Sequence, residues 1–164
     1  TNKVVATFTT GEGACGIAAS PDGRYLYLGG HGVGMWAQRG EKNRDIRVFD
    51  ARTLAQRFVI GCGIMPIAVK FSSDGKQAYV VSHGSGELHI IDTATNKATS
   101  VKVGSDCRDA VSTRDGKWVY VSNRGDNTVS VVDVRAKKAV ATIRVGKSPV
   151  GIALKEATGA QPLK

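Results

Sequence analysis

GSDCRDAVSTRDGKWVYVSNRGDNTVSVVDVRAKKAVATIRVG, residues 104–146, is the stretch that decides the fold. Four short apolar runs alternate with clusters of turn residues, and within the runs valine alternates with polar or small residues. A period of two is expected of a β-strand whose two faces meet different neighbours. The clusters contain Gly, Asn and Asp, which tolerate the positive φ angles of tight hairpins. The stretch therefore predicts four strands joined by hairpins into one small antiparallel sheet.

The same pattern occurs three times along the chain of 164 residues. The turn motifs align at 20–23 (SPDG), 72–75 (SSDG) and 113–116 (TRDG). Five residues after each of these aspartates stands a tyrosine, and each third apolar run ends in an aspartate. These anchors are Tyr27, Tyr79 and Tyr120, and Asp50, Asp92 and Asp133. A repeat of roughly 40 residues with four strands is typical of a β-propeller blade.

The sequence thus predicts an all-β partial propeller of about three four-stranded blades at 1–154, with part-blades at both ends. The blade cores are predicted at 14–53, 66–103 and 108–145. The part-blades are an outermost strand at 3–8 and an innermost strand at 149–154, and residues 155–164 are predicted as a C-terminal tail. Because a propeller closes with at least about 4 blades, we expect a segment of a larger propeller. The remaining blades, or another polypeptide, would cover its two exposed ends.

Three stretches resemble the YVTN-type β-propeller repeat of bacteria and archaea, namely 120–123 (YVSN), 126–133 (DNTVSVVD) and 140–143 (VATI). The resemblance covers nearly the whole chain and is poorest at 31–45. It implies a periplasmic or extracellular protein, since propellers of this type are mostly exported. It says little about activity, because similar blades serve binding proteins, cell-surface proteins and redox enzymes.

The net charge of +9 raises the question of nucleic-acid binding. The basic residues, however, are scattered over the predicted hairpin turns, with few aromatic residues between them to stack on bases. These basic residues are Arg24, Arg52, Lys76, Lys97, Arg114, Lys117, Arg135, Lys137 and Lys138. Nucleic-acid binding through this surface is therefore only a second alternative function. No apolar run reaches the roughly 20 residues that span a bilayer, so no membrane span is expected.

The opposite face of the predicted propeller gathers the unusual residues. Two histidines occupy the same register in adjacent blades, an arginine takes this place in the third blade, and an insertion adds a methionine and a tryptophan. We predict that these residues bind a ligand or partner, because loops of adjacent blades converge on one face. They are His31, Met35, Trp36, His83 and Arg124. Alternatively, the histidines only cap the backbone of their loops, and Trp36 covers the adjacent blade.

Cys15, Cys62 and Cys107 all lie in predicted connections between blades. Three interpretations stay open, which are free thiols, a disulfide between neighbouring connections, and metal ligation. The number is odd, and the chain has no CxxC, CxxCH or HExxH motif. Together with His31 and His83, the cysteines are weak candidates for metal ligands. His89, within a third strand, is predicted to be a structural side chain.

The leading functional hypothesis from the sequence is a non-catalytic propeller segment that binds a ligand or a protein partner, without a cofactor. The alternative is a part of a periplasmic redox enzyme, an oxidoreductase that depends on haem, quinone or copper. The family resemblance supports this alternative, since haem-binding and copper-binding propellers present histidines from this kind of face. A hydrolase has no support, because the chain lacks a GxSxG elbow.

Overall fold

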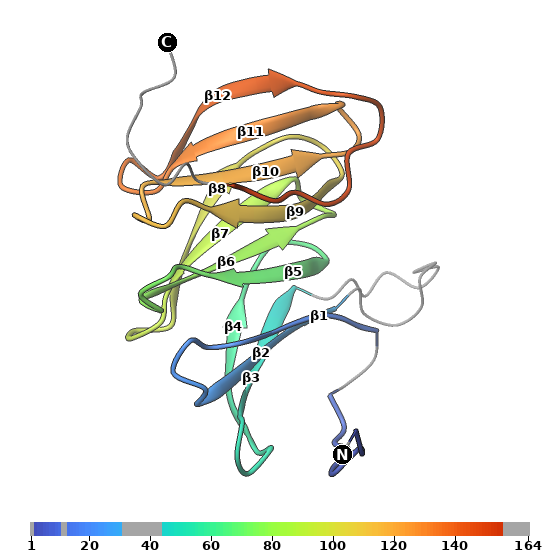
Figure 1. The fold of residues 1–164 in the computed structure, drawn as a ribbon, viewed down its shortest axis with the longest axis vertical. Coiled ribbons are helices and arrows are strands. Elements are labelled where there is room, and N and C mark those ends of the chain that lie inside the picture. The colour runs from blue at the N-terminus through green and yellow to red at the C-terminus, as the bar shows by residue number, and fades with distance from the viewer. Residues whose placement is uncertain (1, 11–12, 31–43, 156–164) are drawn as a thin grey trace.

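The computed structural model describes residues 2–10, 13–30 and 44–155, and within these ranges the regular secondary structure consists of twelve β-strands. They form three sheets of four strands, stacked along the long axis of the molecule (Figure 1). The first sheet contains β1 (Ala14–Ala19), β2 (Tyr25–Gly30), β3 (Asp45–Asp50) and β4 (Gln56–Gly61). The second contains β5 (Pro66–Phe71), β6 (Gln77–Ser82), β7 (Glu87–Asp92) and β8 (Lys97–Lys102). The third contains β9 (Cys107–Ser112), β10 (Trp118–Asn123), β11 (Thr128–Asp133) and β12 (Lys138–Arg144).

In each sheet the strands are antiparallel and pair in chain order, as hairpin connections require. The first strands β1, β5 and β9 contact one another in sequence. The all-β propeller architecture predicted from the repeat is therefore confirmed. No described helix is long and apolar enough to cross a membrane.

The core consists of two apolar layers, one between each pair of neighbouring sheets. Tyr27 belongs to the layer between the first and second sheets, and Tyr79 to the layer between the second and third. Tyr79 is fully buried, whereas Tyr120, in the same register of the third sheet, is partly exposed because no further described sheet covers its face. The repeat thus places one tyrosine on the same face of every sheet, and stacking decides whether it is buried.

The repeated turn motifs close by the same hydrogen bonds in all three sheets. Ser20 Oγ donates to Asp22 at 2.6 Å, and Ser72 and Thr113 make the same contact in the next repeats. The glycine that follows each aspartate has a φ of +70°, a conformation that favours glycine. The hydroxyl bond holds the pKa of Asp22 below its usual value, and the same holds for Asp74 and Asp115. These local bonds explain why the motif recurs.

Three predicted boundaries differ from the structure. The first sheet extends past the predicted core 14–53, because β4 pairs with β3 as far as Gly61. Residues 3–8 and 149–154 are not strands, because no described strand pairs with either segment. Each nevertheless packs on a sheet, since Phe8 contacts Phe49 edge-on at 5.1 Å and Ser122 Oγ donates to Val150 O at 2.9 Å. Most of the predicted tail, residues 156–164, lies outside the described residues.

Candidate functional site

The face opposite the repeated turns carries the loops between second and third strands and the connections from one sheet to the next. His83 follows β6 and Arg124 follows β10, in the register that the sequence predicts. Both backbones are held alike, since His83 N donates to Met65 O and Arg124 N donates to Asp106 O, each at 3.0 Å. Met65 and Asp106 therefore occupy equivalent positions, and both have a left-handed φ, of 57° and 49°.

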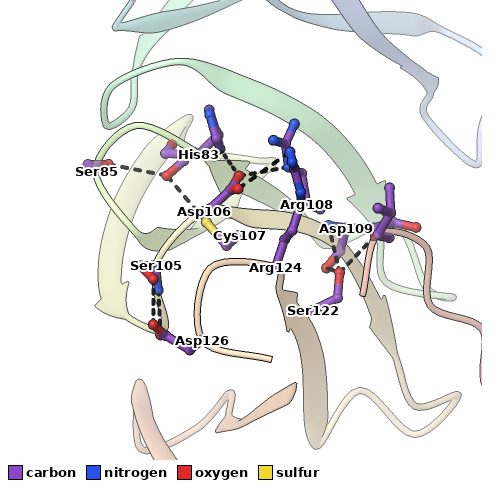
Figure 2. A network of polar contacts seen from close by, with 12 residues as sticks. His83, Ser85, Ser105, Asp106, Cys107, Arg108, Asp109, Ser122, Arg124 and Asp126 are labelled. Atoms are coloured by element: carbon purple, nitrogen blue, oxygen red, sulfur yellow. Dashed lines mark hydrogen bonds and ion pairs between the residues drawn. The ribbon is translucent and has the colours of Figure 1, made fainter. Parts of the chain in front are cut away.

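Of these two residues only Asp106 carries a carboxylate, and the side chains of His83, Arg108 and Arg124 lie around it (Figure 2). His83 Nδ1 lies 2.7 Å from Asp106 Oδ1. Arg108 Nε lies 2.7 Å from the same oxygen, and Arg124 NH1 lies 3.6 Å from Asp106 Oδ2. We call these four residues the Asp106 cluster. It joins the loop after β6, the connection before β9, β9 itself and the loop after β10.

The Asp106 cluster is partly open to solvent, and both of its arginines form ion pairs with Asp106. The side chain of His83 is 21% exposed and that of Arg124 is 45% exposed. His83 Nδ1 and Arg108 Nε are at ion-pair distance from Asp106 without the alignment of a hydrogen bond. Two guanidinium groups share one carboxylate, so the cluster has positive charge to spare for a bound anion. Arg124 is the more exposed and the more distant of the two arginines, and is therefore the better placed to contact one.

The sequence predicts two members of this cluster and misses the other two. The shared register of His83 and Arg124 indicates that they approach each other, and they contact one carboxylate. Asp106 and Arg108 flank Cys107, a residue that the sequence does single out, but no motif marks them. Aligning the connections would have shown an aspartate where the second repeat has Met65. The other predicted binding residues, His31, Met35 and Trp36, lie outside the described residues.

The three cysteines are free thiols in the structure, which agrees with the first of the three interpretations and not with a disulfide between neighbouring connections. Cys107 is fully buried, and its Sγ lies 3.4 Å from Ser82 O. Burial raises the pKa of Cys107 to about 11 and that of Cys62 to about 12, so both thiols are protonated near neutral pH. Cys15 is exposed.

His89 has the structural role that the sequence predicts. It is buried, and its Nε2 accepts a hydrogen bond from Gly63 N at 2.7 Å. Burial lowers the pKa of His89, while Glu87 Oε2, 3.5 Å from the ring, acts in the opposite direction. Among the described residues, no group of three or more His, Cys, Asp or Glu side chains is arranged to hold a metal ion. A copper site gains no support from this part of the chain.

Comparison with known proteins identifies one family and a solved structure of similar fold. The family model described as the cytochrome D1 heme domain matches residues 40–151. Among solved structures, a chain of Kuenenia stuttgartiensis hydrazine synthase is similar, with a TM-score of 0.73 and 22% sequence identity. The match covers 90% of this chain and 41% of that chain, so this chain spans less than half of the length of that relative. No protein of the curated set matches significantly. At this identity the structural likeness shows the fold alone.

Proposed function

Because the chain belongs to the family of the cytochrome D1 haem domain, we propose that it is a propeller segment of a haem-dependent redox protein. The observation that carries this proposal is the family match over 40–151, a range that contains the second and third sheets and the whole Asp106 cluster. The match favours the redox alternative over the non-catalytic binding segment that was the leading hypothesis from the sequence.

The residues of the Asp106 cluster fit the chemistry of haem. Haem iron is commonly held by a histidine, and a metal-ligating imidazole usually has a carboxylate at its other ring nitrogen. His83 already has Asp106 at Nδ1. Haem also carries carboxylate groups, which arginines bind well. His83 would thus hold the iron, and Arg108 and Arg124 would hold the carboxylates. When bound, haem supplies an iron centre that accepts and donates electrons.

The wider setting follows from the same premise. We propose that His31, Met35 and Trp36 contribute to the same site. The remaining blades of a larger propeller, or another polypeptide, would complete it. A periplasmic or extracellular location is part of the proposal, as is the finer resemblance to the YVTN-type repeat. The division into blade cores and tail also belongs here, as the proposed domain organisation. We place haem binding on the face that carries the Asp106 cluster, opposite the basic turns.

The experiment is a titration of the purified chain with haemin, followed by the absorbance of the porphyrin. We expect a saturable spectral change that His83→Ala abolishes, because the variant lacks the imidazole that would hold the iron. Arg124→Ala should weaken binding about tenfold, as expected for loss of one charge-assisted bond. The matched control is Arg135→Ala, which removes an exposed arginine from the opposite face and should bind haemin like the unaltered chain.

Two outcomes would contradict the proposal for this segment. The first is an unaltered chain that binds no haemin while its thermal unfolding is cooperative. The second is a His83→Ala variant that is folded and binds haemin as tightly as before. Either result would return the Asp106 cluster to a purely structural role between the second and third sheets.

A further inference from the structure

A groove lies on the turn face, between the second and third sheets and away from the Asp106 cluster. Its volume is about 520 Å³, and it is lined by the turns that follow β5 and β9 and by the ends of β7 and β11. Its two walls are tied together, because Ser73 Oγ on one turn donates to Arg114 O on the other at 2.6 Å. The floor includes the buried Ser72 and Val134. The groove is therefore a fixed feature of the stacked sheets.

Four exposed cations line this groove from its two sheets, namely Lys76, Arg114, Lys117 and Arg135. Three more, Lys97, Lys137 and Lys138, are exposed in or next to the turns between β7 and β8 and between β11 and β12. Lys76 and Lys117 approach the carboxylates of their own turns, at 3.8 and 3.4 Å. Lys97, Arg135 and Lys138 have no carboxylate at ion-pair distance within the described part of the chain. Such charges can steer and hold an oppositely charged partner.

The carboxylates of the same turns are engaged by the backbone. Asp74 accepts from Lys76 N, and Asp115 accepts from Lys117 N, at 3.1 and 3.0 Å. Asp92 and Asp133 likewise accept backbone N–H groups of their turns. These bonds hold each aspartate against its own turn. The hydroxyls of Ser72 and Thr113, together with the backbone N–H groups, lower the pKa values of Asp74 and Asp115, and the backbone N–H of Thr95 lowers the pKa of Asp92. Four cations and three carboxylates line the groove, so its lining carries a net positive charge.

We propose that this groove and its rim of cations are a docking surface for an acidic protein partner, which inserts a segment rich in Asp and Glu. The chemistry favours protein over nucleic acid for two reasons. No aromatic residue lines the groove, so bases have nothing to stack on. Four carboxylates alternate with the cations along the turns, and they would repel a continuous phosphate backbone, whereas spaced carboxylate side chains can avoid them.

The test uses the full chain and a fluorescein-labelled peptide of about ten residues in which glutamate alternates with serine, roughly 33 Å long when extended. Fluorescence anisotropy measures its binding at low and at moderate ionic strength. The groove variant combines Lys76→Glu, Lys117→Glu and Arg135→Glu. The control variant combines Arg24→Glu, Arg52→Glu and Arg57→Glu, which changes the net charge equally but on two turns and strand β4 of the first sheet. Thermal unfolding checks both, and a neutral groove variant with glutamine at the same three positions replaces the first if that variant is unfolded.

We expect the groove variant to lose at least about tenfold in affinity and the control variant to lose less than about threefold. Equal losses in the two variants would overturn the proposal, because binding would then reflect only net charge. An unaltered chain that does not bind the peptide at low ionic strength would overturn it as well. So would tighter binding, at the same groove, of a labelled oligothymidine of equal charge, since the partner would then be a nucleic acid. Haemin binding is measured separately and does not depend on this surface.

Discussion

The connection from the first sheet to the second and the connection from the second to the third follow one backbone path with different side-chain partners. In the first, Gly63 N donates to His89 Nε2 at 2.7 Å, and Ile64 N donates to Ser85 Oγ at 3.2 Å. In the second, the equivalent Gly104 N donates to Asn123 Oδ1 at 3.1 Å.

The next amide of the second connection, Ser105 N, donates to Asp126 Oδ2 at 2.7 Å. In both connections, therefore, two successive backbone N–H groups find side-chain acceptors. One connection uses an imidazole and a hydroxyl, and the other uses an amide and a carboxylate. The comparison teaches that the repeat preserves the backbone and leaves the choice of acceptor open. The two junctions should differ in their response to substitution and to acid.

The largest effect is expected from adding a methyl group to the glycine of each connection. A Cβ at Gly104 would lie 2.5 and 2.6 Å from the Cγ and Cβ atoms of the fully buried Asn123. A Cβ at Gly63 would meet Ser85 Oγ, Glu87 Oε2 and His89 Nε2, which are the ends of side chains. Gly104→Ala should therefore lower the free energy of unfolding by about 3–4 kcal/mol and Gly63→Ala by about 2 kcal/mol.

Chemical denaturation of both variants measures this difference, with Gly146→Ala as control because a Cβ there meets no atom within 4 Å. Equal losses at Gly63 and Gly104 would show that side-chain mobility does not distinguish the two junctions. A Gly104→Ala variant as stable as the control would contradict the packing of Asn123 described above.

A second effect comes from removing the amide of the second junction. Asn123 accepts from Gly104 N and donates from Nδ2 to Thr128 Oγ1 and Ser130 Oγ, at 3.0 and 2.8 Å. Asn123→Ala removes a fully buried amide and leaves the partly buried N–H of Gly104 without an acceptor, and it should cost about 2–3 kcal/mol in the free energy of unfolding. Hydrogen exchange should show faster exchange at Gly104 N and unchanged exchange at Gly63 N. Loss of protection at both amides would mean that the junctions unfold together.

A smaller effect is expected in how the free energy of unfolding depends on pH, because His89 belongs to only one of the two junctions. Burial lowers the pKa of His89 from 6.5, so the unfolded chain binds a proton more readily than the folded chain does. This histidine therefore contributes stability above pH 6.5 that is lost as the pH falls toward its folded pKa. His89→Gln, which keeps an acceptor but cannot titrate, should make the free energy of unfolding less dependent on pH between about 7.5 and 5. An unchanged pH dependence in His89→Gln would show that other groups cause it.

The smallest change in stability is expected from substituting Ser85 in the first junction or Ser105 in the second. Ser85→Ala removes the acceptor of Ile64 N and should cost about 1 kcal/mol. Ser105→Ala removes only a hydroxyl that donates to Asp126, and the backbone bond of Ser105 to Asp126 remains. We expect it to cost about 0.5 kcal/mol or less. Thermal unfolding of the two variants side by side measures the difference, and a greater loss for Ser105→Ala would reverse the order of the two contacts.

The candidate site was only half predictable from the sequence. Register alone indicated that His83 and Arg124 lie on one face, because equal positions in adjacent blades converge. Nothing local marked Asp106, whose left-handed backbone and position between two sheets direct its carboxylate toward both residues. The state of the cysteines was left open for a related reason, since spacing along the chain does not state how far apart neighbouring connections lie or how their side chains point.

By itself, the sequence determined the strands, the turns and the order in which they pair. These depend on contacts within a few residues, such as the hydroxyl bond of Ser72 to Asp74 and the positive φ of Gly75, which recur with the repeat. Only the tertiary structure decided which residues are covered and which charges meet. Residues 149–154 show why, since their pattern is that of a strand, but a ladder needs a partner strand, and no described strand pairs with them. The same holds for Tyr79 and Tyr120, whose identical registers end in different burial because a sheet face is covered only by its neighbour.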